Sequence, residues 1–320
     1  MSADAWRTRW LPTRTIASTS PLKRDARGTC SPKAEAAKPT RRRPPSPHLP
    51  GVVVAEWAMR LTPEPFRDFL PYTSLSALKV IHTAKVLKRA LEIAQHYGSD
   101  AARGRAAQEL AASLNTSSLS IQVGSSPVAP LDVRALSPEA RAAIGSRVLG
   151  LYFHQLQGQG PWFLDLRPRH LAWDDAQRSL TFFPSGLWYQ PDPDFRRRVQ
   201  SLYEGFYRQD PPALATGVEL YSWDSHPRAG FSQRIEGLLR EHFGPGDAHE
   251  IRFSIAQFRS TFDRIFRETA DSRAKLHPEL TFLGVGLVGL YLTLEQLDVP
   301  LNARRAFEAS APRRGGPEAA

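Results

Sequence analysis

One acidic residue, Asp165, is followed within five residues by three basic ones in the stretch FLDLRPRHLAWD (163–174). A carboxylate in a tight turn could orient a hydroxyl group for a chemical step, and the side chains of Arg167, Arg169 and His170 could together hold a phosphate or a carboxylate. The alternative is structural: backbone N–H groups hold Asp165 in the turn, and Arg167 forms an ion pair with it. The residues alone leave both interpretations open.

A second motif follows shortly after the first. The stretch LTFFPSGL (180–187) is a predicted strand that leads into Pro184, Ser185 and Gly186. A loop with an aspartate, a hairpin and a strand that leads to a glycine follow one another in the order of the catalytic loop and the metal-binding segment of a kinase. Phosphoryl transfer needs a carboxylate for the acceptor hydroxyl, oxygen ligands for magnesium, and a lysine on the nucleotide phosphates.

The order and spacing of these segments resemble the AarF/UbiB family of atypical kinase-like proteins, which are linked to ubiquinone and other isoprenoid-lipid metabolism. The catalytic loop of that family is H-x-D-x-H-P-G-N, followed by D-F-G, whereas this chain has F-L-D-L-R-P-R-H and then P-S-G. The similarity covers about 118–308 and includes four flanking segments: 118–127, 140–160, 195–214 and 276–308. The resemblance implies a truncated protein-kinase-like C-lobe.

The resemblance assigns each loop position a role, and several roles are lost here. Asp165 falls on the catalytic aspartate, and Pro168 keeps the loop proline. His170 stands where the family has a metal-binding Asn. Pro184, which has no side-chain oxygen, stands where the family has a metal-binding Asp.

Other parts of the family pattern are also missing. Arg167 and Arg169 replace a His and a Gly of the family loop, and neither the family's K-x-G-Q motif nor its nucleotide-binding Lys has a counterpart. The lysines upstream lie on a predicted helix and not on a strand that faces phosphates: Lys79, Lys85 and Lys88. Electrostatic groups aimed at a transition state are each worth roughly 3–4 kcal/mol, so the loss of several predicts an inactive Asp165.

The resemblance therefore implies a catalytically impaired pseudokinase that acts as a binding or regulatory module, with a possible link to isoprenoid-quinone or lipid metabolism. One alternative is an active ATP-dependent enzyme with relocated ligands, and only this alternative requires ATP and magnesium. The other alternative is a helical scaffold that binds a protein partner. In the leading hypothesis no cofactor is expected, and the partner is a protein or an isoprenoid or lipid ligand.

The net charge of +10 at pH 7 is unevenly distributed over the 320 residues. Residues 1–60 contain 12 Lys and Arg against 4 Asp and Glu. The high pI thus describes a tail, so nucleic acid is not an expected partner, although the tail could contact a membrane peripherally. Cys30 is the one cysteine, which excludes an intramolecular disulfide and a cysteine zinc site, and favours a cytoplasmic protein. No metal site is expected, because four histidines lack metal-binding spacing: His226, His242, His249 and His277.

Hydrophobic periodicity predicts an α+β fold that is mostly helical, with a small β-hairpin layer and a C-terminal helical bundle. In 137–156, the sequence Ser-Pro-Glu begins a helix with a capping hydroxyl, a proline and an acid. A strand is expected at 118–123, and HLAWD and SLTFF form the hairpin. The other expected helices are 75–97, 101–114, 193–208, 211–221, 229–242, 253–269, 277–297 and 302–309.

Composition divides the chain into four parts. Residues 1–54 are a basic tail rich in Pro and Arg and are expected to be disordered, as are residues 311–320. Residues 55–117 are expected to form a helical N-terminal segment, which the resemblance implies is a remnant N-lobe, and the resemblance makes residues 118–310 the kinase-like C-lobe.

Two apolar features could be confused with ligand or membrane sites. The stretch LTFLGVGLVGLYLTL (280–294) is too short for a bilayer span and is predicted to be a buried helix whose glycines allow close packing. Aromatic residues are dense in 162–223 and are expected to form the hairpin–helix core, with an apolar groove for an isoprenoid or acyl chain as the alternative: Trp162, Trp173, Trp188, Trp223, Phe182, Phe183 and Tyr189.

Overall fold

The computed structural model describes residues 64–72, 76–125, 131–244, 246 and 249–311. The expected tail at 1–54 and residues 312–320 lie outside these ranges. The chain divides into two compact units, Met1–His48 and Leu49–Ala320, and every described residue belongs to the second.

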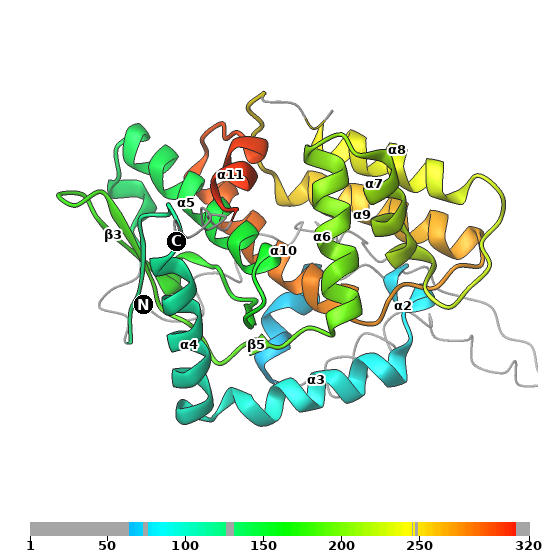
Figure 1. Cartoon of the computed structure of the whole chain (residues 1–320), viewed down its shortest axis with the longest axis horizontal. Coiled ribbons are helices and arrows are strands. Elements are labelled where there is room, and N and C mark those ends of the chain that lie inside the picture. Colours follow the sequence, from blue (N-terminus) through cyan, green and yellow to red (C-terminus); the bar gives the residue numbers. More distant parts are fainter. Residues whose placement is uncertain (1–63, 73–75, 126–130, 245, 247–248, 312–320) are drawn as a thin grey trace, which may run out of the picture. The chain divides into compact units, whose positions relative to one another are not determined.

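Helices precede the first strand (Figure 1). They are the 3-10 helix η2 (Glu64–Tyr72) and the α-helices α2 (Ala77–Val80), α3 (Thr83–Tyr97) and α4 (Asp100–Asn115). The prediction of α4 is confirmed, whereas the prediction of one helix over 75–97 is wrong. The helix is interrupted at Ile81, whose backbone is extended (φ −85°, ψ 152°). Leu276 N–H donates to the Val80 carbonyl (3.0 Å), so a distant segment satisfies the end of α2.

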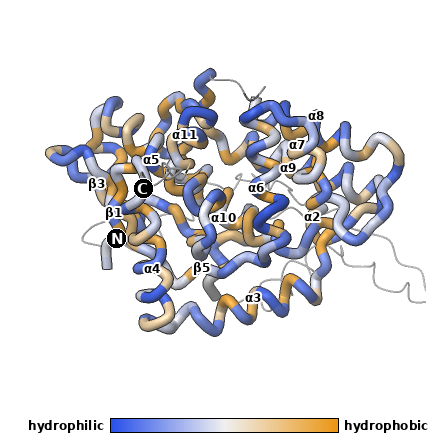
Figure 2. The backbone as a smooth tube through the Cα atoms, in the orientation of Figure 1, coloured by the Kyte–Doolittle hydropathy of each residue, from blue (hydrophilic) through white to orange (hydrophobic). Residues whose placement is uncertain are grey.

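The break also changes which face of α3 is buried. Ala90 and Ile93 are buried, whereas Leu87 and Leu91, which the helical spacing of apolar residues in 75–97 placed on the buried face, are 36% and 50% exposed. Hydrophobic and hydrophilic residues alternate along α3 in Figure 2, as expected for a helix with one buried side.

Two small sheets follow. In the first, β4 (Ser179–Phe182) lies between β1 (Ile121–Val123), which is parallel to it, and β3 (Leu171–Asp174), which is antiparallel. The predicted hairpin is therefore confirmed, with Leu171 opposite Phe182. In the second sheet, β2 (Trp162–Phe163) pairs antiparallel with β5 (Trp188–Tyr189).

The helix α5 (Pro138–Gln157) begins as predicted. Ser137 Oγ accepts a hydrogen bond from Ala140 N–H (3.2 Å), and Pro138 occupies the first turn. Helical spacing in 137–156 predicts a core face, and all its members are buried: Ile144, Val148, Leu151, Tyr152 and Leu156.

The remainder of the second unit is helical, as expected. Its helices are α6 (Pro193–Tyr207), α7 (Pro211–Val218), η5 (Glu219–Ser222), α8 (Phe231–Phe243), α9 (Ile255–Asp271), α10 (Leu280–Leu297) and α11 (Ala303–Ala309). The short 3-10 helices η3 (Val133–Ala135) and η4 (Pro168–His170) lie before α5 and β3. The fold is thus mostly helical α+β, as predicted.

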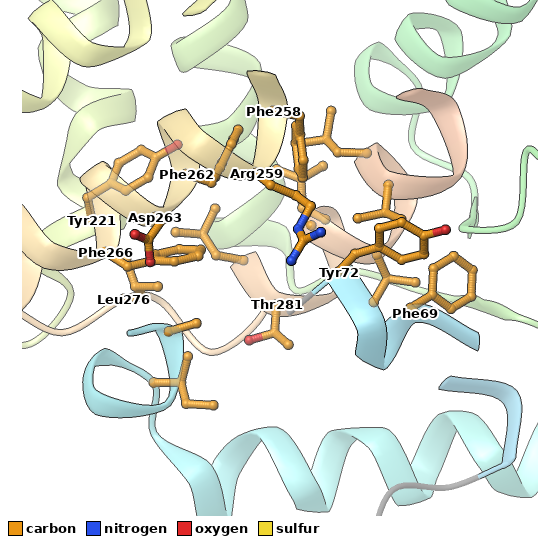
Figure 3. Close-up of a pocket in the computed structure, with 18 of the residues that line it drawn as sticks. Phe69, Tyr72, Tyr221, Phe258, Arg259, Phe262, Asp263, Phe266, Leu276 and Thr281 are labelled. Atoms are coloured by element: carbon orange, nitrogen blue, oxygen red, sulfur yellow. The ribbon is translucent and has the colours of Figure 1, made fainter. Parts of the chain in front are cut away.

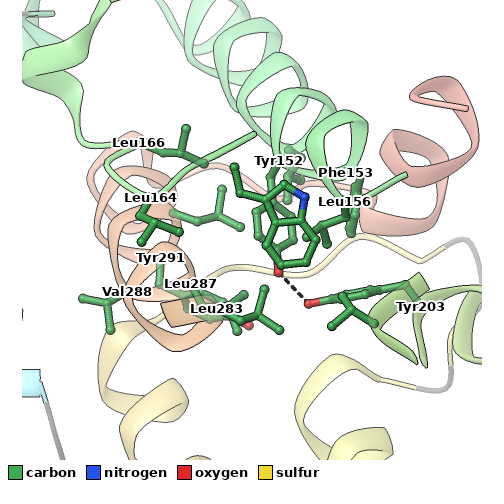
Figure 4. Close-up of a cluster of buried hydrophobic side chains, with 14 of the residues drawn as sticks. Tyr152, Phe153, Leu156, Leu164, Leu166, Tyr203, Leu283, Leu287, Val288 and Tyr291 are labelled. Atoms are coloured by element: carbon green, nitrogen blue, oxygen red, sulfur yellow. Dashed lines mark hydrogen bonds between the residues drawn. The ribbon is translucent and has the colours of Figure 1, made fainter. Parts of the chain in front are cut away.

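The helix α10 crosses the core. It meets α5 and the segment 164–166, and residues from α5, α6 and α10 pack together there (Figure 4). The hydroxyl groups of Tyr152 and Tyr203 form a buried hydrogen bond of 2.6 Å within this cluster. By length and composition α10 is the one described helix that could cross a membrane, and 61% of it is buried inside the protein.

Candidate functional site

The loop that carries Asp165 rests directly on α10. A methyl group at Gly289 would lie 3.1 Å from the Leu164 carbonyl oxygen and 3.3 Å from the Leu166 nitrogen, so glycine allows the two backbones to approach. Thr293 Oγ1 donates to the Leu166 carbonyl (2.7 Å). The glycines of this helix therefore serve packing, as predicted, and Gly289 packs against a loop.

The carboxylate of Asp165 is surrounded by the three basic residues of its own loop. Oδ1 accepts from Arg167 Nε (2.7 Å), and Oδ2 accepts from Arg167 Nη2 (2.6 Å) and Arg169 Nη2 (2.8 Å). His170 Nε2 lies 3.1 Å from Oδ2. The pairing with Arg167 that the sequence suggested is therefore present, and it extends to Arg169 and His170. The Asp165 side chain is only 2% exposed.

This arrangement keeps Asp165 ionised. Burial by itself would raise the pKa of the Asp165 carboxyl, but hydrogen bonds from Arg167 and His170 outweigh that effect and hold the pKa well below its usual range. The same contacts, added to one from Asp68, raise the pKa of Arg167 although burial opposes this. Asp165 is therefore held as an anion beside the cation of Arg167.

A second carboxylate comes from the N-terminal helix η2. Asp68 Oδ2 lies 3.0 Å from Arg167 Nη1 and 3.5 Å from Arg169 Nη1. The Arg167 guanidinium also lies over the Phe69 ring, 4.6 Å from its centroid. Asp68 is 99 residues from Arg167 in sequence, and no local motif predicted this contact.

The second motif lies beside the first, as its position after the hairpin requires. Phe183 N–H donates to the His170 carbonyl (2.8 Å), and Leu164 N–H donates to the Leu187 carbonyl (3.0 Å). Ser185 Oγ accepts from Leu187 N–H (3.2 Å) and so closes a turn. Pro184 and Gly186 bring no oxygen-bearing side chain to this place.

Gly186 is required by packing. A methyl group at this position would lie 2.2 Å from the Tyr97 carbonyl oxygen at the end of α3. The segment that the resemblance aligns with D-F-G is therefore held against the turn between α3 and α4.

The ligands that a metal–nucleotide complex would need are not gathered here. No group of three or more His, Cys, Asp or Glu side chains in the described ranges could hold a metal ion. The three lysines considered above are exposed on α2 and α3: Lys79, Lys85 and Lys88. The structure therefore brings both motifs together without a group of three such ligands among the described residues, and these three lysines lie on helices.

The arginines at the start of α6 have local or backbone partners. Asp192 caps the helix, accepting from Asp194 N–H (2.9 Å), and Asp194 pairs with Arg197 and Arg198. Arg196 is buried and donates to the carbonyls of Gly158 and Gly160 (2.6 Å to Gly160). This helix start is a structural feature and leaves no free anion site.

The dense aromatic region contributes to the core. Trp162, Phe182, Phe183 and Tyr189 are buried. Trp162 packs against Tyr189, and Phe182 packs against Phe163. None of the seven aromatic residues considered above lines the apolar cavity between η2, α2, α9 and α10 (Figure 3).

Comparison with known proteins gives no further assignment. No protein-family model matches the chain, and no curated protein matches it. The resemblance to the AarF/UbiB family therefore rests on the sequence motifs alone.

Proposed function

We propose that this chain is a catalytically impaired, kinase-like protein of the AarF/UbiB type that acts by binding. The observation that carries the proposal is the carboxylate of Asp165, which has three basic partners on its own loop and is 2% exposed. In an active loop that carboxylate would face the acceptor hydroxyl.

A general base must reach the proton that it removes. A carboxylate has about four lone-pair sites, and Arg167, Arg169 and His170 already occupy several of them here. A low pKa makes Asp165 a poor proton acceptor as well, since its protonated form is disfavoured. Both effects support an ionic, structural role for Asp165.

The metal-binding half of phosphoryl transfer has no support either. Pro184 cannot ligate magnesium, and His170, at the Asn position, lies against Asp165. An active enzyme with relocated ligands would need oxygen ligands for magnesium, and the part of the chain that the structure describes offers no group of three or more His, Cys, Asp or Glu side chains for the ion. In this proposal the protein acts by binding a small molecule or another protein, and its function is linked to isoprenoid or lipid metabolism.

The test is a thermal-shift screen of the full chain against ATP and ADP, each with and without magnesium. A ligand that binds the folded state raises Tm by mass action, so a kinase-type site would give a magnesium-dependent shift with ATP. We expect no such shift. A magnesium-dependent rise in Tm that disappears in Asp165→Asn would contradict the proposal.

A further inference from the structure

A cavity with a volume of about 690 Å³ lies between η2, α2, α9 and α10, and residues of α6, η5 and α8 also line it (Figure 3). Sites for small molecules typically measure roughly 300–1,000 Å³ and are lined mainly by apolar side chains with a few polar groups. This cavity has that size and that composition.

The walls are mostly aromatic and aliphatic. Phe258, Phe262 and Phe266 line the cavity from α9, and Leu283 and Leu287 line it from α10. Such walls favour a long apolar chain, because burying it removes apolar surface from water.

Arg259 is an exposed, charged residue on the wall of the cavity. Arg259 of α9 directs its guanidinium into the cavity (Figure 3), and it makes no hydrogen bond or ion pair with the residues that the structure describes. The acidic residue Asp263 also lines the cavity, but it accepts from Ser76 Oγ (2.7 Å) and pairs with Arg267. The unpaired charge at the cavity is therefore positive.

We infer that this cavity binds an anionic amphiphile, a molecule with one long apolar chain and a carboxylate-like head that pairs with Arg259. The chain would lie against the phenylalanines of α9 and the leucines of α10. The inference rests on the proposed function, since it names the class of ligand that a binding protein of this type would hold.

Gly284 provides a direct test of the location. It lies on α10 in the cavity wall, and a methyl group there would meet nothing within 4 Å, so we expect Gly284→Leu to place its side chain in cavity space. The matched control is Gly104→Leu on α4, another helical glycine with open space, outside the cavity. Oleate, kept below its micelle concentration, is titrated into each full-length protein by calorimetry.

We expect saturable oleate binding by the wild type and by Gly104→Leu, and at least about tenfold weaker binding by Gly284→Leu, because the added side chain occupies the space of the ligand chain. No saturable binding by the wild type, or equal binding by both variants, would overturn the inference. So would binding only to vesicles of anionic phospholipid.

Arg259→Gln tests the head group, with oleyl alcohol as the neutral ligand. Loss of a charge-assisted hydrogen bond should weaken the binding of oleate about tenfold and leave the binding of oleyl alcohol unchanged. Equal effects on both ligands would overturn the role of Arg259. Asp165-dependent ATP turnover with normal oleate binding would contradict the proposed function and leave the cavity assignment standing, so the two failures can be told apart.

Discussion

Asp165 has three basic neighbours on its own loop, and the energetic consequence of this arrangement depends on burial. Exposed ion pairs contribute about 0–1 kcal/mol, whereas removing one partner of a buried pair leaves a charge without compensation. Asp165 is 2% exposed and Arg167 is 16% exposed, so the pair belongs to the buried class.

Replacing Asp165 by Ala should therefore lower the free energy of unfolding by about 3 kcal/mol, measured by urea denaturation. Arg167 and His170 would then lose their main partner. The matched control is Asp100→Ala, whose 87% exposed carboxylate pairs with Arg103, and it should cost less than about 1 kcal/mol. Similar small losses for both variants would show that the loop carboxylate is not a structural anchor.

His242 gives a second prediction at this scale, through pH. Burial lowers the pKa of His242 to about 4, and its Nε2 lies 2.6 Å from the hydroxyl oxygen of buried Tyr291. The unfolded state binds a proton near pH 6.5, while the folded state does so only near pH 4. Stability must therefore fall as pH decreases through this window, by about 3 kcal/mol for this group.

The His242→Gln variant should flatten that pH dependence between pH 6.5 and 4. It would not abolish it, because burial also lowers the pKa of His277 to about 4. The measurement is the free energy of unfolding at several pH values for both proteins. Parallel curves for wild type and variant would contradict the assignment.

At the scale of elements, two glycines fix the position of the candidate site. Gly289 lets the Asp165 loop lie on α10, and Gly186 lets the second motif lie against the end of α3. Both contacts are to backbone atoms, which cannot rotate away as a side chain can.

Gly186→Ala should thus destabilise the protein by about 1–3 kcal/mol, because the new methyl group would lie 2.2 Å from the Tyr97 carbonyl oxygen. Gly104→Ala, in the open part of α4, should instead stabilise it by about 0.5–1 kcal/mol. Thermal unfolding of the two variants measures the difference. A neutral Gly186→Ala would mean that the α3–α4 turn moves aside easily.

Elements with local determinants were predictable from the sequence. The start of α5 follows from Ser137 and Pro138, and the hairpin follows from alternating strands around a four-residue loop. The break between α2 and α3 was not predictable, because a distant segment donates to the Val80 carbonyl. The exposure of Leu91 has the same cause, since tertiary contacts selected the buried face of α3.

The same limit applies to the candidate site. Asp165 and its basic neighbours are consecutive in sequence, so their pairing could be proposed in advance. Asp68 could not, because only the folded chain brings η2 to the loop. Arg259 and the cavity also required the structure, since periodicity identifies a buried face but not a space left between helices.

At the scale of the whole molecule, the net charge is concentrated in one part of the sequence. Residues 1–60 hold most of the net charge of +10. We expect any binding to duplex DNA to be weak, to decrease steeply with salt, and to be lost when residues 1–58 are removed. A mobility-shift titration at two salt concentrations measures this. Binding that persists without those residues would indicate a nucleic-acid surface on the folded unit.

The central claim concerns catalysis, and magnesium-dependent ATP hydrolysis by the purified full chain tests it most directly. The wild type and Asp165→Ala are assayed side by side at equal folded concentration. Because the Asp165 carboxylate is hydrogen-bonded to Arg167, Arg169 and His170, we expect both proteins to hydrolyse ATP at the same background rate. Turnover by the wild type well above that of Asp165→Ala would contradict it.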